Sequence, residues 1–81
     1  MRVKVLFFGQ LREVVGLAED SLDVRSGTPI EEVFHHYGVL HPRLNQFRPS
    51  LVASRNQEFA SWDDPVAPGD EIAFLPPVSG G

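Results

Sequence analysis

The sequence predicts an α+β fold in which a mixed sheet packs against one main helix. Two strongly apolar, strand-like segments, residues 2–8 and 71–75, lie at opposite ends of the chain. Between them, residues 28–38 carry apolar side chains at helical spacing. A chain of 81 residues has room for one small domain of this kind and for no deeply enclosed active site.

The first third of the chain predicts a strand, a short helix and a second strand. Residues 2–8 are rich in β-branched and aromatic side chains and are apolar on both faces. Residues 11–15 carry apolar side chains at i, i+3 and i+4 before Gly16, which indicates a short helix closed by a glycine. Residues 21–25 alternate polar and apolar side chains, and we expect them to pair antiparallel with the first strand.

The main helix has the strongest local signal. Thr28 is placed to cap it, Pro29 suits the first helical position, and Glu31 stands where a capping box requires it. Gly38 is interpreted as the residue that ends the helix. The helix presents one apolar stripe to the sheet, formed by Ile30, Val33, Phe34 and Tyr37.

The second half of the chain predicts a short helical stretch followed by three strands separated by turns. Prolines bound the helical stretch, and Pro, Gly, Asn and Asp mark the turns. In chain order these elements are a helical turn or two within 41–49, a strand at 51–54, a turn near Asn56, an edge strand around Phe59, turns at 63–65 and 68–70, and the last strand at 71–75.

This order of elements is typical of a ubiquitin-like β-grasp. The most apolar strands come first and last, so they are expected side by side at the sheet centre, with a right-handed crossover if they are parallel. We expect residues 1–75 to form this domain and residues 76–81 to form a flexible C-terminal Gly-Gly tail. The helix covers one face of the sheet, so apolar residues on the other face need a partner to explain them.

Strand alternation nominates Phe8 and Leu75 as partner-binding anchors on that outer face. If the odd-numbered residues of 3–7 face the helix, Phe8 faces outward, and the phase that buries Ile72 turns Leu75 outward. The alternative is that both belong to a second small core under the loop 56–65.

Composition narrows the classes of function. The chain has no cysteine, a net charge of -4 and few, scattered Lys and Arg, which excludes thiol chemistry and argues against nucleic acid as a partner. A partner with a basic docking surface fits this charge better. No segment suggests a signal peptide or a membrane span, so we expect a cytoplasmic protein. His35 and His36 are interpreted as surface residues rather than metal ligands, and no catalytic constellation is present.

The C-terminal tail is the remaining feature with functional character. Pro76 and Pro77 hold the chain extended after the last strand, and Gly80 and Gly81 carry no Cβ. Such an end can thread a narrow channel and present an unhindered carboxyl group to a nucleophile. The alternative is a frayed terminus, and the two prolines and the upstream β-grasp pattern favour function over it.

Five segments, spread over the whole chain, together resemble the small, sulfur-carrying subunits of molybdopterin synthases, which are ubiquitin-like sulfur carriers. The last two segments are the most specific, and the same tail occurs in archaeal ubiquitin-like modifiers and other sulfur carriers. The segments are residues 5–13, 41–44, 56–58, 68–73 and the stretch Leu75-Pro76-Pro77-Val78-Ser79-Gly80-Gly81.

The resemblance implies a carrier with no catalytic centre of its own, the sulfur-donating small subunit of a two-component transferase. An ATP-dependent adenylyltransferase of the ubiquitin-activating type would convert the Gly81 carboxylate to an acyl-adenylate, and a sulfur donor enzyme would supply the sulfur that replaces AMP. The thiocarboxylate would then enter the large synthase subunit, in a heterotetramer, and two charged carriers would build the dithiolene of molybdopterin. The chain itself would bind no metal or cofactor, because ATP is used by the activating enzyme.

The resemblance also implies roles for the tail. Gly81 is the reacting residue, and the residues inside the partner channel would be Pro76, Pro77, Val78, Ser79 and Gly80. Two other functions stay open at this point. One is a protein modifier joined through Gly81 to lysines, and the other is a carrier for another thiolation pathway, such as that of cysteine, thiamine or tRNA.

Overall fold

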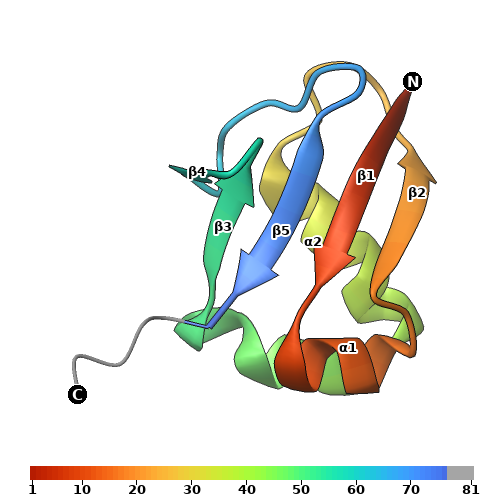
Figure 1. Cartoon of the computed structure of the whole chain (residues 1–81), viewed down its shortest axis with the longest axis vertical. Helices are drawn as coiled ribbons and strands as arrows, with labels where there is room; N and C mark the ends of the chain where they lie inside the picture. The colour runs from red at the N-terminus through yellow and green to blue at the C-terminus, as the bar shows by residue number, and fades with distance from the viewer. Residues whose placement is uncertain (77–81) are drawn as a thin grey trace.

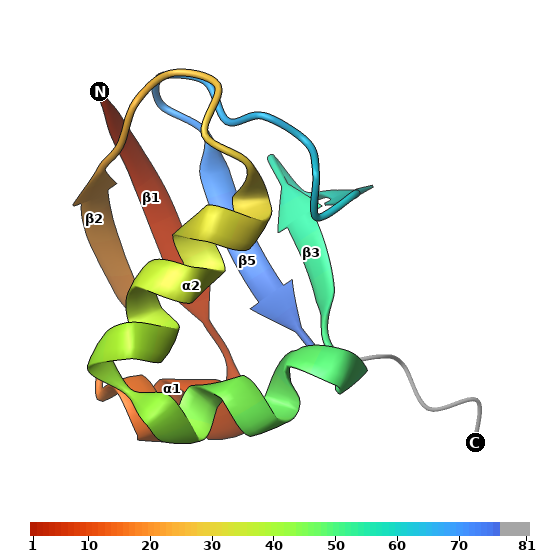
Figure 2. The same ribbon diagram turned by 180° about the vertical axis from the view of Figure 1, so that it is seen from behind.

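The computed structural model describes residues 1–76 and contains a five-stranded mixed sheet with one long helix across one face (Figures 1 and 2). The predicted α+β architecture is confirmed, whereas the tail residues 77–81 lie outside the described part and the domain boundary at residue 75 stays a prediction. The elements are β1 (Arg2–Phe7), α1 (Gly9–Val15), β2 (Glu19–Asp23), α2 (Ile30–Leu40), the 3-10 helix η1 (Pro42–Ser50), β3 (Val52–Arg55), β4 (Glu58–Ala60) and β5 (Glu71–Leu75).

The strands lie in the order β2-β1-β5-β3-β4. The first and last strands are therefore central, as predicted, and they are parallel, with Val5 opposite Ile72. β1 pairs antiparallel with β2, and β3 pairs antiparallel with both β5 and β4. β2 begins two residues earlier than predicted because pairing with β1 runs as far as Leu6 opposite Glu19. The shift is even, so each side chain keeps its predicted face.

The core lies between α2 and the inner face of the sheet, as Figure 2 shows. The predicted α2 stripe is confirmed, since all four of its residues are buried. Its aromatic side chains pack edge to face on the central strands, with Phe34 5.1 Å from Phe74 and Tyr37 4.9 Å from Phe7 between ring centroids. Trp62 stacks on Phe74 at 5.7 Å and extends this aromatic cluster to the β3 side of the sheet.

The start of α2 differs from the prediction. Pro29 precedes the helix, and the Thr28 hydroxyl donates to the Arg25 carbonyl oxygen at 2.7 Å, so the predicted capping box is wrong. The Glu31 carboxylate pairs instead with an arginine of η1. The first two amide groups of α2 donate to backbone carbonyl groups of the loop 61–65, at 3.0 and 2.9 Å. A tertiary contact thus satisfies the donors that a side-chain cap would otherwise serve.

Gly38 does not end α2, contrary to the prediction. The helix continues to Leu40, and His41 follows it as the cap residue. The Asn45 side chain of η1 lies so close to Gly38 that a Cβ there would overlap its Oδ1. The same side chain donates to the Gly38 carbonyl oxygen at 3.1 Å. The glycine therefore permits a close approach of η1 to α2 rather than a change of chain direction.

Candidate functional site

The outer face of the sheet carries one row of register partners that crosses four strands. Leu6 of β1 lies opposite Ala73 of β5, Ala73 opposite Ser54 of β3, and Ser54 opposite Phe59 of β4. The neighbouring row, which contains Phe74, faces α2 and is buried, so this row faces away from the helix. Its two small residues lie at the centre and its two large ones at the sides, which leaves a depression in the surface.

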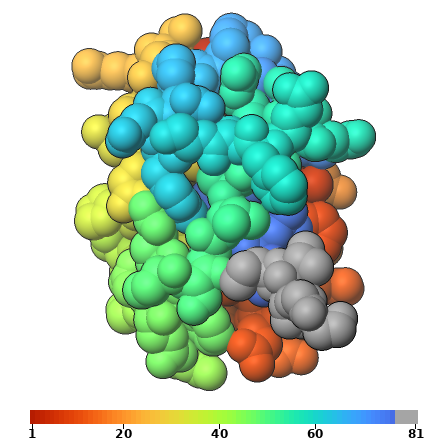
Figure 3. All heavy atoms as spheres, turned by 90° about the vertical axis from the view of Figure 1, so that its left-hand side faces the viewer, coloured from red at the N-terminus to blue at the C-terminus, as the bar shows by residue number. Residues whose placement is uncertain are grey.

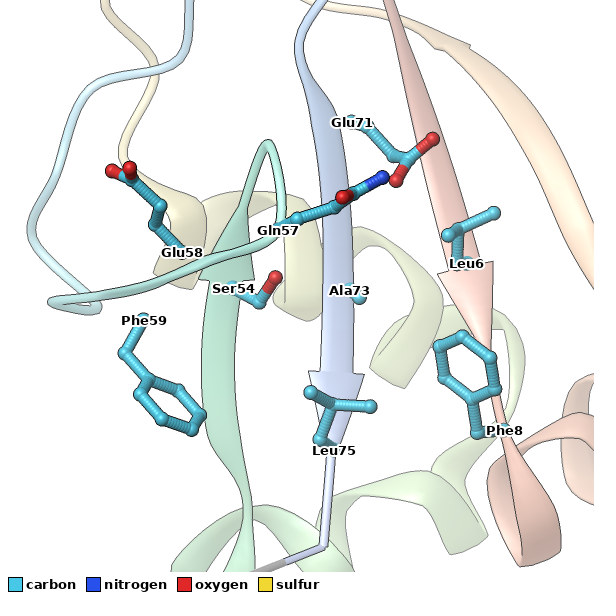
Figure 4. A pocket seen from close by; sticks show the side chains of 9 residues that line it. All are labelled: Leu6, Phe8, Ser54, Gln57, Glu58, Phe59, Glu71, Ala73 and Leu75. Carbon is cyan, nitrogen blue, oxygen red and sulfur yellow. The ribbon is translucent and has the colours of Figure 1, made fainter.

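This depression is an open hollow of about 270 Å³ (Figure 4). Figure 4 shows the side chains of Phe8 and Leu75 at one end of the hollow and Gln57 and Glu71 at the other. Its floor is apolar, and two carboxylates stand on its rim. The complete lining is Leu6, Phe8, Ser54, Gln57, Glu58, Phe59, Glu71, Ala73 and Leu75.

Phe8 and Leu75 both line the hollow, as expected for outward-facing residues. Phe8 is 45% exposed and Leu75 is half-buried, so neither belongs to a second core, and that alternative is wrong. The loop after β4 packs on the other side of the sheet, where Trp62 contacts Phe34 of α2 at 5.6 Å between ring centroids. Figure 3 shows this loop across the edge of the molecule, between the β3–β4 hairpin and α2. The binding role of Phe8 and Leu75 stays a prediction.

A second hollow, of about 290 Å³, adjoins the first at the end of β5. The two share Phe8, and the second also includes Pro76, the last described residue. Phe47 of η1 and Leu51 line its other side. The open apolar surface therefore continues from the middle of the sheet to the point where the chain enters its C-terminal segment.

Polar pairs bound this surface on the β2 side. Arg2 lies 3.5 Å from Asp23 and Lys4 lies 3.7 Å from Glu19, across the β1–β2 ladder. All four side chains are more than half exposed, so these pairs contribute little to stability and keep this part of the face hydrated. The surface that favours an apolar partner is thus limited to β5, β3, β4 and the end of β1.

Phe59 lies in the predicted edge strand, but strand alternation did not predict it as part of the site. Phe59 is 79% exposed, more than any other large apolar side chain among residues 1–76. The sequence did contain a sign that Phe59 belongs to a binding surface, because a central phenylalanine is unusual in an exposed three-residue edge strand. Its face could be assigned only from its pairing with Ser54.

The other residues that were considered for a functional site form none in the described part of the chain. His35 and His36 are exposed, as predicted. Within residues 1–76 no group of three acidic or histidine side chains is arranged to hold a metal ion, and no helix is long and apolar enough to cross a membrane. The predicted channel residues Pro77, Val78, Ser79 and Gly80 and the predicted reacting residue Gly81 lie outside the described residues.

Comparison with known proteins gives consistent results for sequence and structure. The model of the ThiS family matches residues 5–81. The molybdopterin synthase sulfur carrier subunit of Escherichia coli is 42% identical over 82 residues, which cover 98% of this chain and 99% of that protein. The resemblance noted in the sequence is therefore confirmed.

Two solved structures share the fold. The small archaeal modifier protein 1 of Haloferax volcanii is 27% identical, with a TM-score of 0.82 over 95% of this chain and 98% of that one. A chain from the complex of subunits 1 and 2 of the molybdopterin-converting factor of Helicobacter pylori is 22% identical, with a TM-score of 0.68 and full coverage of both chains. These likenesses confirm the ubiquitin-like β-grasp fold.

Proposed function

Because the chain belongs to the ThiS family, we propose that it is a sulfur carrier that acts through its C-terminal carboxyl group in molybdopterin synthesis. The observation that carries the proposal is the 42% identity to the sulfur carrier subunit of Escherichia coli over 98% of this chain. The family model also extends to residue 81, so the match includes the Gly-Gly end. The use of ATP by its activating enzyme suits a cytoplasmic protein.

The chemistry follows from the weakness of a carboxylate as an acyl donor. The Gly81 carboxylate attacks the α-phosphorus of ATP in an adenylyltransferase of the ubiquitin-activating type, and pyrophosphate leaves. Sulfur in the oxidation state of hydrosulfide, supplied by a donor enzyme, then attacks the acyl-adenylate, and AMP leaves. The product is a thiocarboxylate, whose sulfur attacks the pterin precursor, and water then releases the carrier as the Gly81 carboxylate. Two charged carriers supply the two sulfur atoms of the dithiolene. The partners supply the acid and base groups, and this chain supplies the acyl group, without a metal or cofactor of its own.

The outer-face hollow is the docking surface in this proposal. It lies beside Pro76, so a partner that seats on it receives the chain end as well. The partner fills the hollow with apolar side chains and places basic groups near Glu58 and Glu71, in keeping with the net charge of -4. The large subunit of molybdopterin synthase is the expected partner, since the Helicobacter pylori relative forms a complex of subunits 1 and 2.

The test is to change the position of the reacting carboxyl group. Deletion of Gly81 should abolish pyrophosphate exchange with the activating enzyme. Addition of one residue should be equally damaging, because it moves the carboxyl group by about 3.3–3.6 Å. Gly80→Val should impair loading by steric exclusion from the channel, while circular dichroism shows an unchanged fold. Intact mass, read for exchange of oxygen by sulfur, provides the second readout. Normal charging of either length variant would refute the proposal.

A second candidate function is a protein modifier joined through Gly81 to lysines. The likeness to the small archaeal modifier protein 1, with a TM-score of 0.82, favours it. Isopeptide-linked Gly-Gly remnants on cellular lysines would support conjugation. Dithiolene formation by the charged chain with the large synthase subunit would support the sulfur carrier, and charging without dithiolene formation would indicate another thiolation pathway.

A further inference from the structure

A partly buried polar cluster ties the β3–β4 hairpin to the start of β5. The Asn56 side chain donates to Asp70 Oδ1 at 2.9 Å and accepts from the Glu71 amide at 2.9 Å. The Ala67 amide donates to Asp70 Oδ2 at 2.8 Å. Asp70 is only 7% exposed, although it is a carboxylate. We call Asn56 and Asp70, with these two amide groups, the hairpin clasp.

The β3 arm of the hairpin pairs with β5 along its whole length, but the β4 arm has no second neighbouring strand. β4 has three residues and pairs only with β3, at the edge of the sheet. Its turn places both Asn56 and Gln57 at positive φ, 54° and 70°, a region that asparagine tolerates and that is unfavourable for glutamine. The short ladder therefore stabilises the hairpin weakly, and contacts to β5 have a large share in fixing its direction.

Asn56 and Asp70 lie next to residues that line the hollow and take no direct part in lining it. Neither Asn56 nor Asp70 is among the lining residues, whereas the hairpin contributes Gln57, Glu58 and Phe59 to one wall. The other wall comes from β1 and β5, which belong to the rigid centre of the sheet. The width of the hollow thus depends on where the clasp holds the hairpin.

We propose that Asn56 and Asp70 are positioning residues for partner docking, which hold Phe59 at a fixed place across the hollow from Phe8. This proposal rests on the proposed function, because it assumes that the activating enzyme binds the hollow as the large subunit does. The clasp thus joins residues 56–58 to residues 68–73, two segments that lie apart in the sequence.

The protonation state of Asp70 suits this role. Burial raises the pKa of its carboxyl group, but hydrogen bonds from Asn56 and from the Ala67 amide, with the nearby Arg55, lower it more, so the pKa lies below its usual value. The group is therefore an anion at neutral pH. Hydrogen bonds to an anion are shorter and stronger than those between neutral groups, which stiffens the clasp.

Three variants separate positioning from general stability. Asn56→Gly keeps the positive φ and removes both side-chain hydrogen bonds. Asn56→Asp places two carboxylates against each other. The double variant Asn56→Asp with Asp70→Asn restores the three hydrogen bonds of the clasp, because the amide group of residue 70 then donates to residue 56 and its oxygen still accepts from the Ala67 amide. It removes only the 3.5 Å ion pair of Asp70 with Arg55. Val33→Ala serves as a control that destabilises the core and leaves every bond of the clasp in place.

The measurement is pyrophosphate exchange by the full chain with its activating enzyme, at carrier concentrations that resolve KM from kcat. We expect Asn56→Gly and Asn56→Asp to raise KM about tenfold, as for the loss of one interface anchor, with kcat unchanged. The double variant should recover the wild-type KM, and Val33→Ala should leave KM unchanged. In a double-mutant cycle with Phe59→Ala, Asn56→Gly should add little, since the clasp acts through Phe59.

Each outcome decides the proposal. If the wild-type chain supports exchange and the clasp variants keep its KM, or if the swapped pair fails to recover it while folded, the positioning role is wrong and the proposed function stands. If the wild-type chain supports no exchange with its cognate enzyme, the proposed function fails and this inference fails with it. Should Asn56→Asp not fold, Asn56→Gly and the swapped pair carry the test.

Discussion

The two faces of the sheet are built on the same strands and differ by a shift of one residue. On the inner face, Phe7, Phe74 and Ala53 are register partners and are at most 1% exposed. On the outer face, the next row has small residues at its centre, flanked by Leu6 and Phe59. Large residues under α2 fill a core, whereas small residues between large ones leave a hollow. The inner face is closed because α2 covers it, and the outer face, which no helix covers, keeps a hollow over its small central residues.

The difference has an energetic meaning. Burial of an apolar side chain stabilises a domain by about 1.5–3 kcal/mol, so the inner face supplies folding free energy. The outer face leaves Phe59 79% exposed and gains that free energy only when a partner covers it. Substitutions on the inner face should change stability, and those on the outer face should change binding.

The largest effect is expected from Phe34→Ala, on the helix side. Phe34 is 3% exposed and contacts the rings of both Phe74 and Trp62. Its loss should lower the free energy of unfolding by about 3–5 kcal/mol, through lost burial and a residual cavity. Urea unfolding followed by circular dichroism measures this loss, and Phe34→Leu should cost less. A nearly unchanged urea midpoint would contradict the view that the inner face supplies stability and the outer face supplies binding.

A smaller effect, on binding alone, is expected from Phe8→Ala and Leu75→Ala. Each should weaken association with the large subunit at least about tenfold, because a few buried anchors dominate such interfaces. The melting temperature should change little. Leu17→Ala is a matched control, since Leu17 is 46% exposed, like Phe8 at 45%, and does not line the hollow. Equal affinity of all three variants by calorimetry would exclude the outer face as the docking surface.

The smallest effect concerns the clasp, which joins the hairpin beside the hollow to the start of β5. The pKa of Asp70 is lowered in the folded state, so its contribution to stability is present above the unfolded value of 3.8 and is lost as the pH falls through the lower folded value. Thermal unfolding measured between neutral pH and this window should show a steeper acid loss in the wild-type chain than in Asp70→Asn. Parallel curves would show that the carboxylate contributes no net stability.

The sequence by itself determined the elements and the faces of most of them. Alternation along β1 and β5 and the α2 stripe of Ile30, Val33, Phe34 and Tyr37 arise from local backbone geometry, which repeats every 2 or 3.6 residues. The central position of the first and last strands followed from their apolar character. The outward direction of Phe8 and Leu75 followed from the same alternation, and the family resemblance gave the expected role of the C-terminal glycines.

Only the tertiary structure decided which distant groups meet. The loop 61–65 caps α2 in place of Thr28, and the close approach of Asn45 is the reason that residue 38 is a glycine. Asn56 joins Asp70 across 14 positions of the chain. Phe59 belongs to the hollow because of its register with Ser54. Local patterns carry no information about such pairs, because a backbone donor or a short polar side chain has many acceptable partners. The packing of the whole sheet and helix selects one of them.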